Sequence, residues 1–335
     1  FVALNLSPMV FAGQVYSGVD YQYFRDFAEN KGKFTPGAQN IEVVNKKGES
    51  IGTMMQNAPM IDFSVVSRNG VAALVGDQYI VSVAHNVGYS GVDFGMEGSN
   101  PDQHRFAYNI VKRNNYKNDS THPYMTDYHN PRLTKFVTEA APIEMVSKMQ
   151  GSTYGDLEKY PMRVRIGSGR QVVRDAQDKD TEVSGAYHYR TAGNTFMQGW
   201  ANNGEVSLSG DVRHPNQYGP LPISGSGGDS GSPMFIYDKT AGKWLLNGVL
   251  RSGHPYEGKE NTYQIARKNY LDEIIARDLV TVFEPTAASY DWTTDGNGSG
   301  TLIKDGRVAA NTPLANYSLA SSGSDEAFGY GGPNP

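Results

Sequence analysis

Residues 227–233 have the sequence GGDSGSP, in which Ser230 stands between an aspartate and a glycine. A serine hydroxyl is a weak nucleophile, so a reactive serine must project from a tight turn toward a base. Glycines permit the backbone angles of such a turn and leave room beside the serine. The chain has 38 glycines, so an ordinary loop is the alternative. The interpretation depends on a base and a carboxylate elsewhere in the chain.

The same turn carries two backbone donors beside the serine. Acyl transfer passes through an oxyanion, and N–H groups that converge on this oxyanion stabilise the transition state. Gly228 can adopt the backbone angles that aim such a donor. We expect the N–H groups of Gly228 and Ser230 to form an oxyanion hole.

A histidine at the end of an apolar strand is the best candidate for the base. His85 follows the run VSVA at residues 81–84, and a strand end holds a side chain in a fixed place. The small Ala84 leaves space next to a nucleophile. The other histidines, none of which ends such a strand, are His104, His122, His129, His188, His214 and His254.

A carboxylate must orient the histidine and stabilise its charged form. Chymotrypsin has the order His, Asp, Ser, with gaps of about 45 and about 93 residues. Asp127 lies 42 residues after His85 and 103 residues before Ser230, which is close to this spacing. The other carboxylates considered are Asp93, Asp102 and Asp119. An aspartate only 8 residues after His85, as Asp93 is, leaves too little chain to travel around a barrel and return. Asp127 is favoured.

The composition excludes several classes of protein. The chain has 335 residues, a net charge of −5 and a pI near 5.8, which argues against binding nucleic acid through a basic patch. It has no cysteine, which excludes disulfides and thiolate metal sites. His122, Asp127 and His129 are a possible metal set, and Gly167-Ser168-Gly169 resembles part of a dinucleotide loop. Since the rest of either motif is missing, we expect no metal and no cofactor.

Three segments are expected along the chain. Residues 1–12 are mostly apolar and resemble the end of a secretory signal peptide, with a buried N-terminal strand as the alternative. Residues 13–284 form the main domain. Residues 285–335 are rich in Gly, Ser, Asn and Asp and are interpreted as a linker or the start of a further, incomplete module. No segment reaches about 18 consecutive apolar residues, so we expect no membrane contact.

The pattern of apolar residues favours an all-β fold with two short helices. Residues 20–30 and 268–279 have helical spacing, and Asp20 is a plausible N-cap for the first helix. Residues 71–84 and 234–250 each predict a β-hairpin. Many short strands with few helices are typical of a barrel or a sandwich.

Five stretches have a distinctive sequence. They are DYQYFRDFAENKGKF (20–34), APMIDFSVVSRNGVAALVGDQYIVSVAHN (58–86), NPDQHRFAYNIVKRNNYK (100–117), NPRLTKFVTEAAPIE (130–144) and GDSGSPMFIYD (228–238). On these stretches the chain resembles the protease domain of the trypsin-like, IgA-protease-type autotransporters of Gram-negative bacteria. Within that group it is most similar to the adhesion-and-penetration proteins of Haemophilus and Neisseria.

The resemblance implies a chymotrypsin-like fold, with two six-stranded antiparallel β-barrels and the active site between them. The family's triad falls on motifs that match His85, Asp127 and Ser230. The domain would be the N-terminal part of a secreted or surface-bound passenger, before a β-helix stalk and a membrane translocator. Members of this subgroup cleave their own passenger and act as adhesins. The implied partners are therefore protein substrates, including the passenger itself and host extracellular proteins.

The chain departs from animal serine proteases in two respects. Those enzymes commonly have the sequence GDSGGP, whereas Ser232 replaces the second glycine here, as in the IgA-protease group. In trypsin-like enzymes the aspartate that matches Asp229 pairs with a newly freed N-terminal amine. No Ile-Val-Gly-Gly-like start follows a basic residue here, which leaves the partner of Asp229 open.

The trypsin-like layout also predicts residues that bind substrate. Ser224, six residues before the nucleophile, would lie at the base of the specificity pocket. An acidic residue there selects Arg or Lys, so a serine favours an uncharged, Leu-like P1 residue. The strand that pairs with substrate backbone would consist of Leu250, Arg251, Ser252 and Gly253.

Two other functions are compatible with parts of the pattern. A non-catalytic adhesin or binding module could use the same fold, but it would not need all three triad residues. An esterase or lipase is disfavoured by the order of the triad and by the absence of G-x-S-x-G around Ser230.

Overall fold

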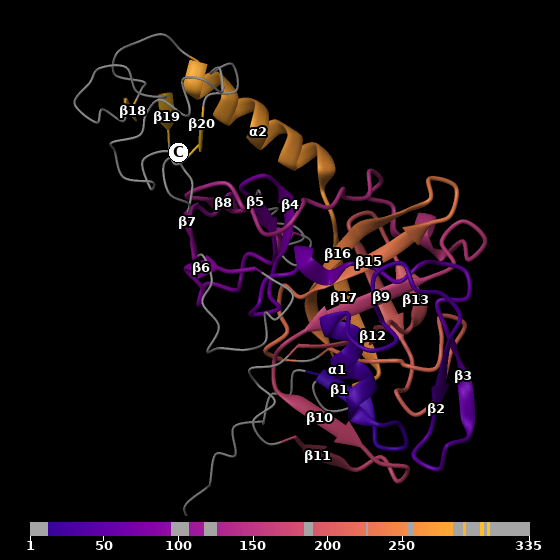
Figure 1. Cartoon of the computed structure of the whole chain (residues 1–335). Helices are drawn as coiled ribbons and strands as arrows, with labels where there is room; N and C mark the ends of the chain where they lie inside the picture. The colour runs from indigo at the N-terminus through magenta and orange to yellow at the C-terminus, as the bar shows by residue number, and fades with distance from the viewer. Residues whose placement is uncertain are drawn as a thin grey trace, which may run out of the picture.

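The computed structural model describes residues 13–94, 107–116, 126–183, 190–225, 227–253 and 258–283, with short strands at 291–292, 302–304 and 307–308. The chain is mostly β-structure with few helices, and two curled sheets make up most of it (Figure 1). The all-β expectation is confirmed at this level. Several sequence predictions lie outside the described residues: the signal-peptide remnant at 1–12, His104, His122, His188, His254, Asp102 and Asp119.

The N-terminal sheet has five strands. Their spatial order is β4 (Ala73–Gly76), β5 (Tyr79–Val81), β8 (Arg132–Leu133), β7 (Tyr108–Lys112) and β6 (Gly91–Val92). The predicted hairpin at 71–84 is confirmed, since β4 and β5 pair antiparallel. Leu74, Ile80 and Leu133 are fully buried in a small apolar core of this sheet.

The C-terminal sheet has seven strands. Their order is β12 (Thr191–Asn194), β9 (Arg163–Gly167), β15 (Pro233–Asp238), β16 (Lys243–Gly253), β17 (Glu260–Ile265), β14 (Glu205–Ser209) and β13 (Met197–Ala201). All neighbours in this sheet run antiparallel, and β15 with β16 forms the hairpin predicted at 234–250. Among the described residues, the N-terminal sheet has five strands and the C-terminal sheet has seven. The pair of six-stranded barrels therefore stays a prediction.

Smaller sheets complete the β-structure. β1 (Gly13–Tyr16) pairs parallel with β10 (Gln171–Arg174), which also pairs with β11 (Asp180–Glu182). β2 (Ile41–Val44) and β3 (Ser50–Met54) form a hairpin, and β18 (Asp291–Trp292), β19 (Leu302–Lys304) and β20 (Arg307–Val308) form a separate sheet. Short 3-10 turns within the described residues include Phe63–Val65 and Gly151–Gly155.

Helix α1 (Tyr21–Glu29) begins as the sequence predicts. The carboxylate of Asp20 accepts a hydrogen bond from the backbone N–H of Gln22 and caps the helix. Phe24 and Phe27 are fully buried, and α1 packs against β12 of the C-terminal sheet. The amphipathic spacing therefore predicts both the helix and the face that it buries.

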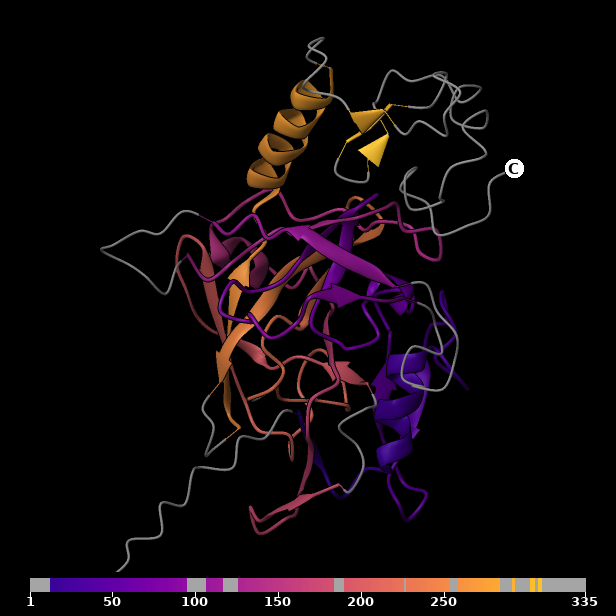
Figure 2. The same cartoon turned by 90° about the vertical axis from the view of Figure 1, so that its left-hand side faces the viewer.

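Helix α2 (Lys268–Phe283) is longer than predicted. The sequence indicated an end at residue 279, but neither glycine nor proline interrupts residues 268–283. Pro285 disfavours helical angles for the residue before it, which accounts for an end near this point. In Figures 1 and 2 the helix rises from the end of the C-terminal sheet. Within the described residues, no helix has both the length and the apolar character that a membrane crossing requires.

Helix α2 is bonded to the N-terminal sheet by a buried carboxylate. Asp278 accepts a 2.5 Å hydrogen bond from the hydroxyl of Tyr79 on β5, and its carboxylate lies 3.8 Å from the guanidinium of Arg132 on β8. The last helix of the domain therefore helps to hold the first sheet.

Asn30 connects the end of α1 to two other segments. It adopts left-handed backbone angles with φ of 52°. Its amide donates to the carbonyls of Phe34 and Ile61 and accepts from the N–H of Phe63. A buried side chain with three such bonds stabilises the packing of these segments.

Asn30→Ala should therefore lower the free energy of unfolding by about 2–4 kcal/mol, since it leaves buried backbone groups without partners. Asn40 is a matched control, because it has φ of 53° but an exposed side chain. Asn40→Ala should cost only the backbone strain, about 1 kcal/mol. Urea unfolding measures both values. Equal losses in the two variants would contradict the role assigned to the Asn30 side chain.

Candidate active site

A short antiparallel pairing brings two of the predicted site residues together. Ser82, just after β5, donates its N–H to the carbonyl of His129 and accepts the N–H of His129 in return, at 3.2 and 3.0 Å. His85 lies three residues after Ser82, and Asp127 lies two residues before His129. In an antiparallel pair these steps lead to neighbouring positions. The register therefore brings His85 beside Asp127.

The side chains of His85, Asp127 and Ser230 form a continuous chain of hydrogen bonds. His85 Nδ1 lies 2.5 Å from Asp127 Oδ2, and the backbone N–H of His85 donates to Asp127 Oδ1 at 2.8 Å. On the other side of the ring, His85 Nε2 lies 2.8 Å from Ser230 Oγ. The structure thus brings together the three residues that the motif, the apolar run and the spacing singled out. The imidazole is half exposed, whereas the Asp127 side chain is 14% exposed.

The Ser230 turn is pressed closely against the end of β5. Gly228 and Gly231 have positive φ angles of 94° and 86°. A Cβ at Gly231 would lie 2.0 Å from the hydroxyl oxygen of Ser82 and 2.5 Å from the carbonyl oxygen of Val71. Only glycine fits this position, and the close approach holds Ser230 near the segment after β5 that carries His85.

Two further contacts concern the backbone of the turn. The Asn86 side-chain amide donates to the carbonyl of Ser230 at 3.1 Å. Among the residues that the structure describes, no acceptor is bonded to the N–H of Gly228 or of Ser230. Both predicted oxyanion donors are therefore open. Asn86 was not predicted, although an amide directly after the candidate base was a usable signal.

Asp229, the residue before Ser230, is paired with a buried arginine. Arg165 Nη2 lies 3.1 Å from Asp229 Oδ2, and the N–H of Gly169 donates to Asp229 Oδ1 at 3.1 Å. Each side chain of the ion pair is 1% exposed. Arg165 was not predicted, although an arginine inside the apolar strand at 162–166 was a visible signal.

Ser224 lies in a hydrogen-bonded wall beside the Ser230 turn. It is fully buried, and its backbone pairs with Gln14 of β1 through two hydrogen bonds of 2.8 and 3.0 Å. The Asn261 side chain bonds to both Gly225 and the hydroxyl of Ser224, at 2.6 and 3.3 Å. The hydroxyl is therefore engaged by its neighbours, and Asn261 is a partner of Ser224 that the sequence did not indicate.

The predicted substrate strand is the end of β16. Its pairing with β15 ends at Val249, after which it continues beside β17 as far as Gly253. Leu250 is buried and exchanges backbone hydrogen bonds with Gly231 and Ser232, whereas Ser252 is exposed. The guanidinium of Arg251 lies 3.0 Å from the Glu205 carboxylate, so its side chain is directed to β14.

His129 differs from His85 in its surroundings. It is fully buried, and its ring bonds to the Tyr89 hydroxyl and the Asn115 amide oxygen at 2.7 and 3.2 Å. Burial, with the nearby charge of Arg113, lowers the pKa of His129 to about 3. Among the described residues, no three His, Asp or Glu side chains form a group suited to a metal ion.

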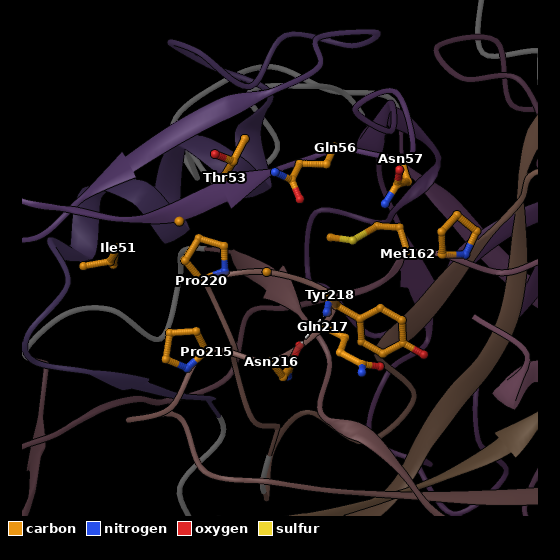
Figure 3. A pocket seen from close by; sticks show the side chains of 13 residues that line it. Ile51, Thr53, Gln56, Asn57, Met162, Pro215, Asn216, Gln217, Tyr218 and Pro220 are labelled. Carbon is orange, nitrogen blue, oxygen red and sulfur yellow. Dashed lines mark hydrogen bonds between the residues drawn. The ribbon is translucent and has the colours of Figure 1, made fainter. Parts of the chain in front are cut away.

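A separate groove lies between the β2–β3 hairpin and the loop at 215–220 (Figure 3). It encloses about 300 Å³ and is lined by side chains that include Gln56, Asn57, Met162 and Tyr218. None of the His85, Asp127 and Ser230 side chains lines it. The loop at 215–220 precedes Ser224 by a few residues in the chain.

Residues 12–269 match the family model of the immunoglobulin A1 protease, a peptidase family, and this covers well over half of the chain. The chain belongs to the immunoglobulin A1 protease family. It is 61% identical to an adhesion and penetration protein autotransporter of Haemophilus influenzae over 99% of its length. It is 33% identical to an IgA-specific serine endopeptidase autotransporter of Neisseria gonorrhoeae over 94% of its length.

A solved structure supports the family assignment. The crystal structure of the Haemophilus influenzae Hap adhesin superposes on this chain with a TM-score of 0.73, and the two sequences are 68% identical. The match covers 79% of this chain and 28% of the Hap adhesin chain. The present chain spans about a quarter of the curated relatives, 24% of the Haemophilus protein and 23% of the gonococcal one. The family is thus shown for a segment of a much longer type of protein.

The depressed pKa of His129 makes the family domain less stable in acid. Between about pH 3 and the ordinary histidine value of 6.5, the unfolded chain binds a proton that the native chain excludes. The stability that this group contributes is present above about pH 6.5 and is lost as the pH falls, by up to about 1.4 kcal/mol per pH unit.

His129→Gln should therefore flatten the dependence of the unfolding free energy on pH, measured by urea unfolding at several pH values from about 4 to 7. The absolute stability also falls, because hydrogen bonds to Tyr89 and Asn115 change. Only the slope of the unfolding free energy against pH reports the proton that residue 129 takes up on unfolding. His214→Gln, at an exposed histidine, is the control. An unchanged slope in His129→Gln would contradict this account.

Proposed function

We propose that the chain is the catalytic domain of a serine endopeptidase. The observation that carries the proposal is the position of the His85 ring, 2.5 Å from Asp127 and 2.8 Å from Ser230. Membership of a peptidase family supports it independently. In this proposal Ser230 is the nucleophile, His85 the base and Asp127 the group that orients the base.

In the first half of the proposed reaction, Ser230 Oγ attacks the carbonyl carbon of a peptide bond. Its proton passes to His85 Nε2, and Asp127 stabilises the resulting imidazolium through Nδ1. His85 then gives the proton to the leaving amine as the C–N bond breaks. A water molecule repeats the sequence on the acyl-enzyme, and the serine is regenerated with release of the acid.

The N–H groups of Gly228 and Ser230 are the proposed oxyanion hole. Their lack of acceptors among the described residues supports this role, since an oxyanion donor must be free to bind substrate. We also infer that the five- and seven-stranded sheets correspond to the two barrels of a chymotrypsin-like fold. The location of the three side chains between elements of both sheets supports that correspondence.

The proposed substrates are proteins with an uncharged P1 residue. Ser224 at the pocket wall carries no charge, and Leu250 presents an apolar side chain beside Gly225, where an added Cβ would lie 2.6 Å from it. The side chain of Arg251 is paired with Glu205 and adds no free cation to the strand. We propose that Arg251, Ser252 and Gly253 offer their backbone to the substrate.

The names of the relatives suggest the biological setting. Because they are autotransporters, we propose that this chain is exported to the bacterial surface or secreted as part of a passenger. The name of the Haemophilus relative also supports a second candidate function in adhesion. Release of the passenger by self-cleavage and cleavage of host extracellular proteins are the reactions proposed for this domain.

Ser230→Ala should reduce kcat for peptide cleavage by about 10⁶-fold, because the nucleophile is lost while binding groups stay. Wild type should react with a fluorophosphonate probe at Ser230, which labels only an activated serine. The matched control is Ser90→Ala, at an exposed serine. It should cleave and label like wild type.

The same experiment separates the two candidate functions. A folded wild type that neither cleaves a peptide library nor labels would contradict the peptidase and favour an adhesion module. Turnover that persists in Ser230→Ala would contradict the assigned nucleophile.

A peptide library should be cut mainly after uncharged, medium-sized apolar residues such as Leu. The reason is an uncharged pocket wall at Ser224 and Asn261, which offers no carboxylate to a basic P1 side chain. Mass spectrometry of the cleaved ends measures the preference. Cleavage dominated by Arg or Lys would contradict this assignment of the pocket.

A further inference from the structure

We propose that Arg165 is a positioning residue that holds the Ser230 turn in its reactive form, in place of the N-terminal amine that trypsin-like proteases use. The proposal rests on the peptidase function proposed above. It concerns a group that touches no substrate and acts through Asp229. It also implies that the turn is formed without a proteolytic activation step.

Arg165 contacts the turn on both sides of the nucleophile. Its Nη2 lies 3.1 Å from the carboxylate of Asp229 and donates to the hydroxyl of Ser232 at 3.0 Å. Asp229 precedes Ser230, and Ser232 follows it by two residues. The N–H of Gly169 holds the other carboxylate oxygen of Asp229 at 3.1 Å. A single buried cation therefore fixes the residues that flank Ser230.

The sheet holds Arg165 in a fixed place. Its backbone is in the middle of β9, paired with Gly193 of β12 on one side and with Met234 of β15 on the other. A Cβ at Gly225 would lie 2.9 Å from the Cζ of the guanidinium. The charged group is therefore packed between the Ser230 turn and the wall that Ser224 begins.

The first described strand, β1, is bonded to β10 and to Ser224. Gly13 pairs with Gln171 of β10, and Gln14 pairs with both Val172 and Ser224. Gly167 lies beside the ion pair of Arg165 and Asp229. A Cβ added there would lie 2.3 Å from Asp229 Oδ1 and 2.8 Å from Arg165 Nη2, so only glycine fits. The space beside the carboxylate is thus shaped around the guanidinium.

A guanidinium and an amine differ in how they titrate. An arginine stays protonated in proteins, whereas an α-amino group loses its proton near pH 8 and an ordinary lysine near pH 10.4. Tyr263 on β17 also faces the pair, with Arg163 near it, and burial raises the pKa of Tyr263 to about 12. The turn should therefore be insensitive to alkali up to about pH 10.

Arg165→Lys is the deciding variant. Burial lowers the pKa of a lysine from about 10.4 and the neighbouring Asp229 carboxylate raises it, whereas a guanidinium stays protonated. This variant should therefore lose kcat as the pH rises above about 9, while the wild type keeps its kcat up to about pH 10. At neutral pH it should retain more activity than Arg165→Met. In Arg165→Met, kcat should fall by about 10²-fold or more at every pH, with a smaller change in KM, because the oxyanion donors are misplaced.

Arg163→Met controls for the general cost of removing a buried arginine. Arg163 is on the same strand and fully buried, but it donates to the carbonyl of Tyr154. This variant should be less stable than wild type yet keep its kcat and its flat alkaline profile. Circular dichroism establishes that each variant is folded at the assay temperature, and the rate of fluorophosphonate labelling gives a second measure of the turn.

The outcomes separate the two proposals. A new alkaline loss in Arg165→Lys, absent from wild type and Arg163→Met, supports the role of Arg165. Profiles and kcat values that match wild type in both Arg165 variants would overturn it while leaving the peptidase intact. A wild type that itself loses kcat near pH 8 would point to an amine instead. A wild type that neither cleaves nor labels would overturn both proposals.

Discussion

The candidate site depends on the contact between Ser82 and the backbone of two other segments. The peptide group of Ser82 pairs with His129 and thereby sets the register that places His85 next to Asp127. Its hydroxyl, bonded to Val71, forms the surface against which Gly231 lies without room for a side chain. Ser82, the residue that follows β5, thus aligns His85, Asp127 and the Ser230 turn, although these are widely separated in the sequence. Close packing of this kind leaves little freedom for the three groups to move apart.

Buried charged side chains hold several segments of this cysteine-free chain together. Arg132, Arg163, Arg165 and Arg190 are among its largest fully buried side chains. Arg190 pairs with Glu29 and so bonds helix α1 to the start of β12, as Arg165 bonds β9 to the Ser230 turn. Breaking such a pair by removing one partner is strongly destabilising, because an uncompensated charge is left in the interior.

Local patterns predicted several elements, and motifs with their spacing predicted which side chains meet at the candidate site. Helical periodicity identified α1 with its Asp20 cap, and short apolar runs separated by turn residues identified both hairpins, because these signals depend on neighbouring residues. The glycine-rich motif selected Ser230, the apolar run before the histidine selected His85, and the spacing to both selected Asp127. Arg165, Asn86 and Asn261 were missed because their roles come from contacts with distant residues, and a polar side chain inside a strand does not indicate its partner. The division of strands into five and seven was not predictable either, since strand pairing depends on long-range contacts.

The bond between Asp278 and Tyr79 has a consequence for the order of folding. The two residues are 199 positions apart, so this contact closes one of the longest loops in the domain. The five-stranded sheet is encoded first, but the carboxylate that contacts its strands β5 and β8 is present only when α2 has been made. A nascent chain that lacks residues 268–283 therefore has the strands of this sheet without one of their partners. Contacts of such high sequence separation slow folding, so the first sheet should be among the last parts to become fully stable.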